Sequence, residues 1–396
     1  MIYTLFFCSF VSENIAYMKI CLIGVGNVGR VILLDLIGQK EVEQVYAVDY
    51  NIDALRSFIS KLDTEKVVPM KGDIRNIDLT AEQMSKADYV INASWYEFNI
   101  YAIKAMLKAK RDMLDLGGLY WMTKKELEWD GEVRKAGLTL LLGAGDDPGT
   151  SNILARYGAD KLDEVDEIHI RWGSKGGEED LFGFSVVTIM DEASMDAVMY
   201  LDGKLVKVPP LSHKEVTWFP EPIGYLNTYA IIHSELATLP YTIKDVKTVT
   251  YKDSWDESIF PIIKFLRNVG LTSREEVDVL GVKVRPIQLL GSLIRPREDP
   301  SVYGSLKVSV KGVKDGEERR YTYYLGPVKG REDWGAGVTA ITTGYGAVAG
   351  LKCLVEGLVP KGVTPPELIE KPNVWIQELG RRGLNIVEVE ERIRPI

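Results

Sequence analysis

The apolar positions of residues 18–145 form short runs with few polar residues, separated by segments with helical periodicity. The runs lie at residues 20–24, 44–48, 66–70, 89–93, 113–118 and 138–142. An apolar run without alternation is typical of a strand that is covered on both faces of a parallel sheet. Between two of these runs, Ile52, Leu55 and Ile59 mark one face of a helix. Six strands alternating with helices predict a doubly wound parallel α/β sheet, which binds ligands at the carboxyl ends of its strands.

The pattern changes after the sixth run. Residues 165–172 alternate like a half-buried strand, and residues 183–189 also read as a strand. The turn signal Asp202-Gly203 separates a helical stretch from a further strand. Residues 306–310 and 320–325 flank a glycine-containing turn, which predicts a β-hairpin. We therefore expect a second, α+β domain with a mixed or antiparallel sheet.

The expected domain boundaries follow from these patterns. Residues 337–358 are apolar and rich in small side chains, which predicts a helix that returns to pack on the first domain. The expected organisation is a first domain over residues 18–147, a second over 148–334 and a C-terminal segment over 335–396 that packs back on the first.

The first 17 residues fall outside this scheme. Their apolar stretch lacks the basic flank and the small-residue cleavage site of a secretory signal, and it is too short to span a bilayer. Met18 directly precedes the first predicted strand. We interpret residues 1–17 as an upstream extension from a misassigned start codon, with a loosely attached native tail as the alternative.

A glycine motif follows the first predicted strand. Gly24, Gly26 and Gly29 form G-x-G-x-x-G, with Asn27 and Val28 between the second and third glycines. In a strand–turn–helix context the first glycine permits a tight turn, the second lets a pyrophosphate approach the backbone, and the third lets helix and strand pack closely. The phosphates then lie at the helix N-terminus, where free N–H groups point outward. This context predicts a dinucleotide-binding domain, although a glycine turn in an ordinary α/β core remains the alternative.

Acidic and polar residues at later strand ends refine the expected cofactor. Asp49 ends the second predicted strand, 20 positions after Gly29. A carboxylate there accepts hydrogen bonds from the ribose hydroxyls and repels a 2′-phosphate, which favours NAD over NADP. Asp73 is expected beside the adenine, or simply in a turn, and Asn92 and Ala93 end the fourth strand beside the cofactor.

Composition narrows the class of protein. The 396 residues are 46% hydrophobic and 27% charged, as in a globular enzyme, and carry a formal charge of −9 without a basic cluster. We therefore expect neither nucleic acid nor a membrane as partner. The three cysteines are far apart and have no histidine nearby, so neither a disulfide framework nor a zinc site is predicted, and a cytoplasmic location is expected.

The loop after the sixth strand carries candidate chemistry. Its sequence over residues 143–154 is GAGDDPGTSNIL. Asp147 followed by Pro148 reads as a helix N-cap and a first helical residue, so a helix N-terminus is expected to face the cleft. A well-capped helix with no further role is the alternative.

Together these motifs resemble the saccharopine dehydrogenase-like family, and within it the lysine 6-dehydrogenases. The matching segments are GVGNVG, VINASWYEFN, LDLGG, GAGDDPGTSNILA, HSELATLP and TTGYGAVAGLKCLVEGLVPKGVTPPE. The resemblance implies a second domain similar to the catalytic domain of glyceraldehyde-phosphate dehydrogenases, closing over a nicotinamide. It also implies oxidation of a C–N bond in an amino acid such as lysine, to the semialdehyde and ammonia, or the reverse reductive amination. The acidic pair Asp146-Asp147 departs from the apolar pair often seen in the family.

Such chemistry needs a base and a clamp for the substrate's charged groups. Candidates for the base are Glu97, Asp147, His233 and Glu235, of which Glu97 is favoured because it follows the strand that ends at the nicotinamide. Glu235 would then hold the cationic end of the substrate. His233 is equally consistent with a hydrogen-bonded strand histidine, and Glu235 with a surface acid.

Arg171, placed at a strand end, is the candidate fork for a substrate carboxylate. A surface arginine paired with Glu167 or Glu178 is the alternative.

Three functions remain open on the sequence. The leading hypothesis is an NAD-dependent amino-acid dehydrogenase with a small-molecule amino-acid substrate, expected to form a homodimer. A saccharopine- or carboxyspermidine-type reductive dehydrogenase, with an imine substrate and NADPH as the alternative cofactor, is the second. A non-catalytic NAD-binding module is the third, and it would not need to keep the candidate residues together at one cleft.

Overall fold

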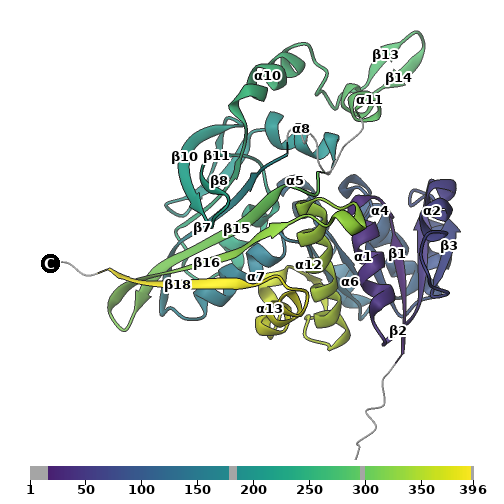
Figure 1. Ribbon diagram of the computed structural model, residues 1–396, viewed down its shortest axis with the longest axis horizontal. Helices are drawn as coiled ribbons and strands as arrows, with labels where there is room; N and C mark the ends of the chain where they lie inside the picture. Colours follow the sequence, from purple (N-terminus) through teal and green to yellow (C-terminus); the bar gives the residue numbers. More distant parts are fainter. Residues whose placement is uncertain (1–16, 178–184, 295–298, 394–396) are drawn as a thin grey trace, which may run out of the picture.

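A computed structural model describes residues 17–177, 185–294 and 299–393. Nearly all of the expected N-terminal extension, residues 1–17, lies outside the described residues. Two large sheets with helices around them make up the molecule (Figure 1).

The first sheet contains seven strands, all parallel. In spatial order they are β17 (Gly362–Thr364), β6 (Thr139–Leu141), β5 (Asp112–Asp115), β4 (Tyr89–Asn92), β1 (Met18–Ile23), β2 (Val42–Asp49) and β3 (Val67–Lys71). Its helices are α1 (Asn27–Gly38), α2 (Ile52–Ile59), α3 (Ile77–Ser85), α4 (Asn99–Ala109), α5 (Tyr120–Leu127) and α6 (Asp130–Lys135). The predicted doubly wound α/β fold is confirmed, and β17 extends it by a strand that no pattern predicted.

The second sheet is mixed, as expected. Its strands run in the order β10 (Ser212–Phe219), β11 (Gly224–Ala230), β12 (Thr248–Ser254), β7 (Glu164–Lys175), β15 (Tyr303–Lys314), β16 (Glu317–Lys329) and β18 (Ile386–Ile393), with β8 (Ala197–Leu201) and β9 (Lys204–Val208) beside β12. Only the β12–β7 pair is parallel among the strand pairs described for this sheet. The predicted hairpin is β15–β16.

Helices α8 (Val186–Ser194), α10 (Phe260–Asn268) and α11 (Pro286–Leu293) pack together at the edge of the second sheet, next to the small hairpin of β13 (Val277–Val279) and β14 (Val282–Val284) (Figure 1).

Two predictions about the second domain are corrected by the structure. Of the strand expected at 183–189, residues 183 and 184 lie outside the described residues and the rest form helix α8. Ile189 and Met190 are buried between α10 and α11, so this tertiary packing overrides the β-propensity of the valines before them. The Asp202-Gly203 turn joins two strands rather than a helix and a strand.

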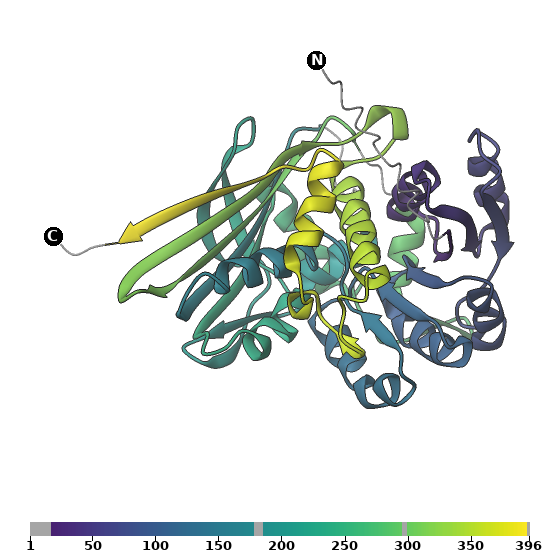
Figure 2. The same cartoon turned by 90° about the horizontal axis from the view of Figure 1, so that it is seen from below.

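Helix α12 (Val338–Val355) lies between the two sheets (Figure 2). It packs against α1 and α13 (Pro372–Arg381), while α7 (Thr150–Ala159) packs against β15 and α13. A helix this apolar has the length to cross a membrane, but 78% of its apolar window is buried inside the protein. Within the C-terminal segment, α12 and β17 pack on the first sheet, whereas β18 joins the second. The exact domain boundaries stay a prediction.

Candidate functional site

The glycine loop between β1 and α1 forms an open cradle at the end of the first sheet. Gly24 has φ +85°, and a Cβ on it would lie 2.7 Å from the carbonyl oxygen of Ala93. A Cβ on Gly29 would lie 2.1 Å from the carbonyl oxygen of Gly24. At Gly26, in contrast, a Cβ would meet nothing within 4 Å, and no side chain caps the helix that begins at Asn27. The free N–H groups and the open space fit the pyrophosphate of a dinucleotide.

A cavity of about 380 Å³ adjoins this cradle and is suited to an adenosine. It is lined by Gly24, Asp49, Tyr50, Asp73 and Arg75, among other residues. The Asp49 carboxylate accepts hydrogen bonds from the backbone N–H of Val25 and of Asn51, both at 2.8 Å. The guanidinium of Arg75 pairs with Asp73, and this contact lowers the pKa of Asp73.

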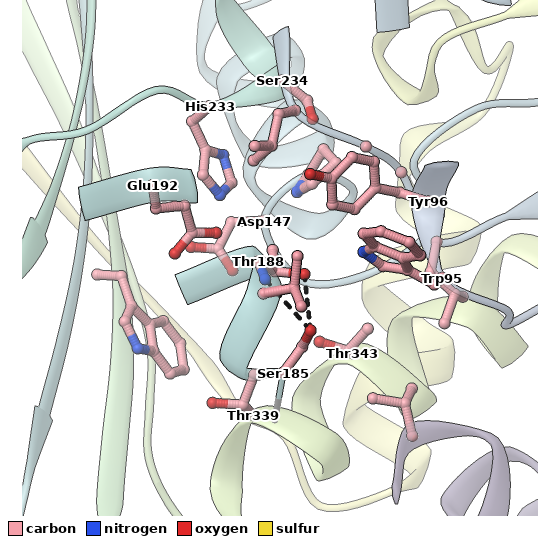
Figure 3. Close-up of a pocket in the computed structure, with 18 of the residues that line it drawn as sticks. Trp95, Tyr96, Asp147, Ser185, Thr188, Glu192, His233, Ser234, Thr339 and Thr343 are labelled. Carbon is pink, nitrogen blue, oxygen red and sulfur yellow. Dashed lines mark hydrogen bonds between the residues drawn. The ribbon is translucent and has the colours of Figure 1, made fainter. Parts of the chain in front are cut away.

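A second cavity of about 380 Å³, the inner cavity, lies next to the adenosine cavity, because Ser94 and Trp95 line both. Asn27 and Val28 of α1 lie on its cofactor side. The inner cavity is further lined by Tyr96, Asp147, Trp172, Glu192, His233, Ser234, Tyr251, Asp253 and Thr339 (Figure 3). These residues come from both sheets and from α8 and α12, so the inner cavity lies where the two halves of the molecule meet.

Of the residues predicted at the fourth strand end, Asn92 is buried and donates from its amide nitrogen to Asn99 at 3.0 Å, while its oxygen accepts from the Ser94 hydroxyl at 2.6 Å. It therefore holds in place the loop that separates the two cavities. Ala93 follows it against the glycine loop.

The loop at residues 143–149 brings Asp147 into the inner cavity. Asp115, at the end of β5, accepts hydrogen bonds on one carboxylate oxygen from the backbone N–H of Gly117 and Gly143, which ties two loops together. The predicted N-cap role of Asp147 is wrong. Helix α7 begins at Thr150 and its N-cap is Gly149, because the Asp147 carboxylate accepts a hydrogen bond from the Tyr251 hydroxyl instead.

His233 and Asp147 lie together at the inner end of the cavity. The His233 ring stacks on Tyr251 at 3.8 Å between centroids and is hydrogen-bonded through Nδ1 to Glu235. Burial lowers the pKa of His233, but the charge and hydrogen bond of Glu235, with the charge of Asp147, outweigh burial and raise it to about 9. Burial raises the pKa of Asp147 to about 6, although the charge of His233 opposes this shift. A cation therefore faces a carboxylate that titrates just below neutrality.

Two further acids complete the wall of the inner cavity. Burial raises the pKa of Glu192 to about 8, and it raises the pKa of Asp253 well above its usual value, with the charge of Asp147 adding to both shifts. Figure 3 shows the carboxylates of Glu192 and Asp147 facing the same space beside the His233 ring. None of the described residues that line this cavity is Lys or Arg. On the described wall of the inner cavity three carboxyl groups therefore surround one cationic side chain, His233, and a bound cation would favour the ionised forms of these acids.

Glu235 lies behind the inner cavity rather than at its surface. It is fully buried and accepts a hydrogen bond from the Ser151 hydroxyl at 2.7 Å, besides its contact with His233. Its position is suited to orienting the imidazole of His233, and it has no exposed edge for a substrate.

The predicted base Glu97 lies outside the residues that line the inner cavity. Its carboxylate forms an ion pair with Arg274, and Arg285 lies 3.8 Å away. Arg274 also pairs with Asp191 and donates to the Tyr96 hydroxyl at 2.6 Å. Glu97 is thus a member of an ionic cluster that links the loop after β4 to the second half of the molecule.

Arg171 also lies away from the inner cavity, and it is within β7 rather than at its end. Its guanidinium is buried and donates to Glu215 at 2.8 Å and to Thr250 at 3.0 Å. Among the described residues, Glu215 is the acid with which it pairs, and it does not pair with Glu167. Its two terminal nitrogens already donate to protein oxygens, while Nε is buried without a partner among the described residues, so a substrate in the inner cavity cannot reach a carboxylate fork at this residue.

Sequence reasoning missed four groups of the inner cavity: Trp172, Glu192, Tyr251 and Asp253. Tyr251 and Asp253 are two positions apart on β12 and so share one face of the strand, a spacing that could have been noticed. Glu192 lies just beyond the strand expected at residues 183–189, and no local signal marks it.

An open dinucleotide cradle that leads into an enclosed cavity with titratable side chains is the arrangement of an NAD(P)-binding oxidoreductase. Comparison with known families identifies the type. Residues 20–141 match the saccharopine dehydrogenase NADP binding domain, and residues 145–384 match the saccharopine dehydrogenase C-terminal domain. The chain belongs to the saccharopine dehydrogenase family, which confirms the resemblance inferred from its motifs, and it is an NAD(P)-dependent oxidoreductase acting on a C–N bond.

Sequence identity to individual relatives is low. Carboxyaminopropylagmatine dehydrogenase of Synechocystis sp. is 25% identical over 390 residues, covering 94% of this chain and 97% of the relative. Carboxynorspermidine synthase of Vibrio cholerae is 25% identical over 339 residues, covering 78% and 81%. Among solved structures, the apo saccharopine dehydrogenase (L-Glu forming) of Saccharomyces cerevisiae has a TM-score of 0.72 at 16% identity, covering 94% of this chain and all of that one. The last likeness supports the fold alone.

Proposed function

We propose that this protein joins a cationic amine to the aldehyde of an amino acid and reduces the resulting C=N bond with a nicotinamide cofactor. The single observation that carries this proposal is the acidic lining of the inner cavity at the end of the cofactor cradle. Of the two enzymatic hypotheses drawn from the sequence, the named relatives favour this reductive alternative over lysine oxidation, because their names join a carboxyl group to a polyamine or to agmatine.

The reaction balances in two steps. The ammonium R–NH3+ and the aldehyde R′–CHO form the iminium R–NH+=CHR′ and water. Bound in the cradle, NAD(P)H supplies a hydride to the iminium carbon, which gives the secondary amine R–NH–CH2R′ and NAD(P)+. The first step needs a base for the ammonium and an acid for the departing water.

Asp147 and His233 are suited to these two roles. Asp147, with a pKa of about 6, is mostly ionised at neutral pH and accepts the proton of the ammonium. His233, with a pKa of about 9, is protonated and donates a proton to the carbinolamine oxygen as water leaves. Glu235 keeps the imidazole oriented through its contact with Nδ1.

The chemistry of the relatives' names indicates the aldehyde. A carboxyaminopropyl group on nitrogen is the product expected when an amine condenses with aspartate semialdehyde and the imine is reduced. For the cofactor we propose NAD, because Asp49 lines the adenosine cavity and the guanidinium of Arg75 is already paired with Asp73.

The test is a screen of purified protein with NADH and NADPH. Agmatine, putrescine and 1,3-diaminopropane are each combined with aspartate semialdehyde, cofactor absorbance is followed, and products are identified by mass. We expect cofactor oxidation that requires both amine and aldehyde, with the secondary amine as product. NAD reduction by lysine alone, without turnover of any amine and aldehyde pair, would show that the leading sequence hypothesis is the right one.

A further inference from the structure

A larger cavity opens from the far side of the inner cavity. This outer cavity, of about 950 Å³, shares Trp172, Glu192, Asp253 and Thr339 with the inner cavity. The two cavities are therefore adjacent, and Glu192 and Asp253 line both; we call this shared boundary the junction. A substrate whose reacting nitrogen is beside Asp147 can extend through this junction into the outer cavity.

Glu192 at the junction has no partner of its own. It is 6% exposed and makes no hydrogen bond or ion pair with any described residue. One oxygen of Asp253 is likewise buried without a hydrogen-bond partner among the described residues. Burial without a partner favours the protonated form of both acids in the free protein, and a ligand with positive charge at this point would favour their ionised forms and pair with them.

The rest of the outer cavity is suited to an alkyl chain that ends in a cation. Trp172 and Trp255 provide aromatic surface against which methylene groups or a cation pack favourably. The two lysines on its wall are already engaged, since Lys214 pairs with Glu257 and Lys175 donates to the carbonyl of Ile223 at 3.0 Å. Lys175 keeps its positive charge because the carbonyl it contacts is neutral, but neither lysine is hydrogen-bonded or ion-paired to Glu192 or Asp253.

We propose that the junction between the two cavities is a binding subsite for the second cation of a linear di- or polyamine, and that Glu192 is the residue that binds it. The proposal rests on the proposed function and makes it more specific. The enzyme selects amines that carry a second ammonium or a guanidinium at the end of a short alkyl chain, and it discriminates against monoamines of the same length.

The first experiment uses the wild-type protein with aspartate semialdehyde and its preferred reduced cofactor. Putrescine and agmatine are compared with butylamine, which has the chain length of putrescine but lacks the second cation. A charge-assisted contact in a buried site is worth about 1.5–3 kcal/mol, which predicts a kcat/KM for the two dications about tenfold to a hundredfold above that of butylamine.

The second experiment uses Glu192→Gln, with Glu257→Gln as a matched control from the same cavity. Glu192→Gln should raise the KM of putrescine by about tenfold or more, with the KM of butylamine and the affinity for cofactor almost unchanged. Because Lys214 neutralises Glu257, the control should leave the ratio of the two amines at its wild-type value.

The possible failures are distinguishable. If no amine is turned over with the aldehyde, the proposed function and this subsite are both wrong. If amines are turned over but the wild-type protein treats butylamine and putrescine alike, or Glu192→Gln affects both amines equally, the subsite alone is wrong. The wild-type comparison decides the question even if Glu192→Gln does not fold.

Discussion

Replacement of Gly346 by Ala tests whether the contact between α12 and the loop at residues 143–149 positions the catalytic groups. A Cβ at residue 346 would lie 2.0 Å from the carbonyl oxygen of Gly145 and 2.5 Å from its carbonyl carbon. Ordinary contact begins at about 3.5 Å, so helix and loop must separate by more than about 1 Å. That carbonyl also accepts hydrogen bonds from the backbone N–H and the hydroxyl of Thr150, which begin helix α7.

The expected cost of Gly346→Ala is about 3 kcal/mol, the upper end of the range for overpacking a core. The gain of about 1 kcal/mol in helix propensity offsets only part of it. Because Asp147 is two residues beyond Gly145, kcat should also fall by about a hundredfold, the effect of a misplacement of about 1 Å.

The assay is denaturant unfolding and steady-state kinetics of Gly346→Ala beside Gly380→Ala. Gly380 is an exposed residue of α13 where a Cβ would meet nothing within 4 Å. The control should therefore be as stable as wild type or gain up to about 1 kcal/mol. If Gly346→Ala is as stable and as active as this control, the close approach of α12 does not fix the loop.

Three further outcomes are expected. Asp49→Ala should weaken NAD binding and improve the relative tolerance of NADP, as measured by titration of both cofactors. An unchanged preference would show that Asp49 does not contact the ribose. Asp147→Asn should lower turnover by about a hundredfold to ten-thousandfold, with cofactor affinity nearly unchanged. Glu97→Gln should keep turnover within about tenfold of wild type, and the opposite ranking of the two variants would show that Glu97 is the base. Folding raises the pKa of Glu192 from 4.5 to about 8 and that of His233 from 6.5 to about 9, so each contributes stability at low pH that is lost as pH rises through the folded value. The free energy of unfolding should therefore fall from about pH 4.5 to about pH 9, most steeply between pH 6.5 and about pH 8 where both groups contribute, and fall less in Glu192→Gln; a flat wild-type profile would contradict both shifts.

The first half of the chain was predictable because its signals are local. Strands of a parallel sheet covered on both faces are apolar at nearly every position. Two of the glycines after β1 lie where a Cβ would clash with neighbouring backbone, so only glycine fits there. The spatial order of the first six strands then follows from the general preference of doubly wound folds. Strand β17 was not predictable in this way, because residues 362–364 gain their strand character only by pairing with β6.

Local rules failed where a distant partner decided the structure. The Asp147-Pro148 pair has the local signature of a helix start, yet the hydroxyl of Tyr251, 104 positions away, takes the carboxylate. Glu97 likewise follows the expected strand, but Arg274 and Arg285 from the second half of the molecule surround it. Both arginines are far from Glu97 in the sequence, and no sequence motif links them to it.

The acidic character of the inner cavity is the part of the site that only the fold reveals. Asp147, Glu192 and Asp253 come from a loop, a helix and a strand, and each taken alone reads as an ordinary solvated acid. Brought together in the fold, all three have pKa values raised by burial, and the charge of Asp147 adds to the shifts of Glu192 and Asp253. Such an arrangement lowers the stability of the free protein, and His233 compensates only part of the charge. Function is the expected reason for keeping a destabilising cluster, and a ligand that brings two positive charges is the one that relieves it most.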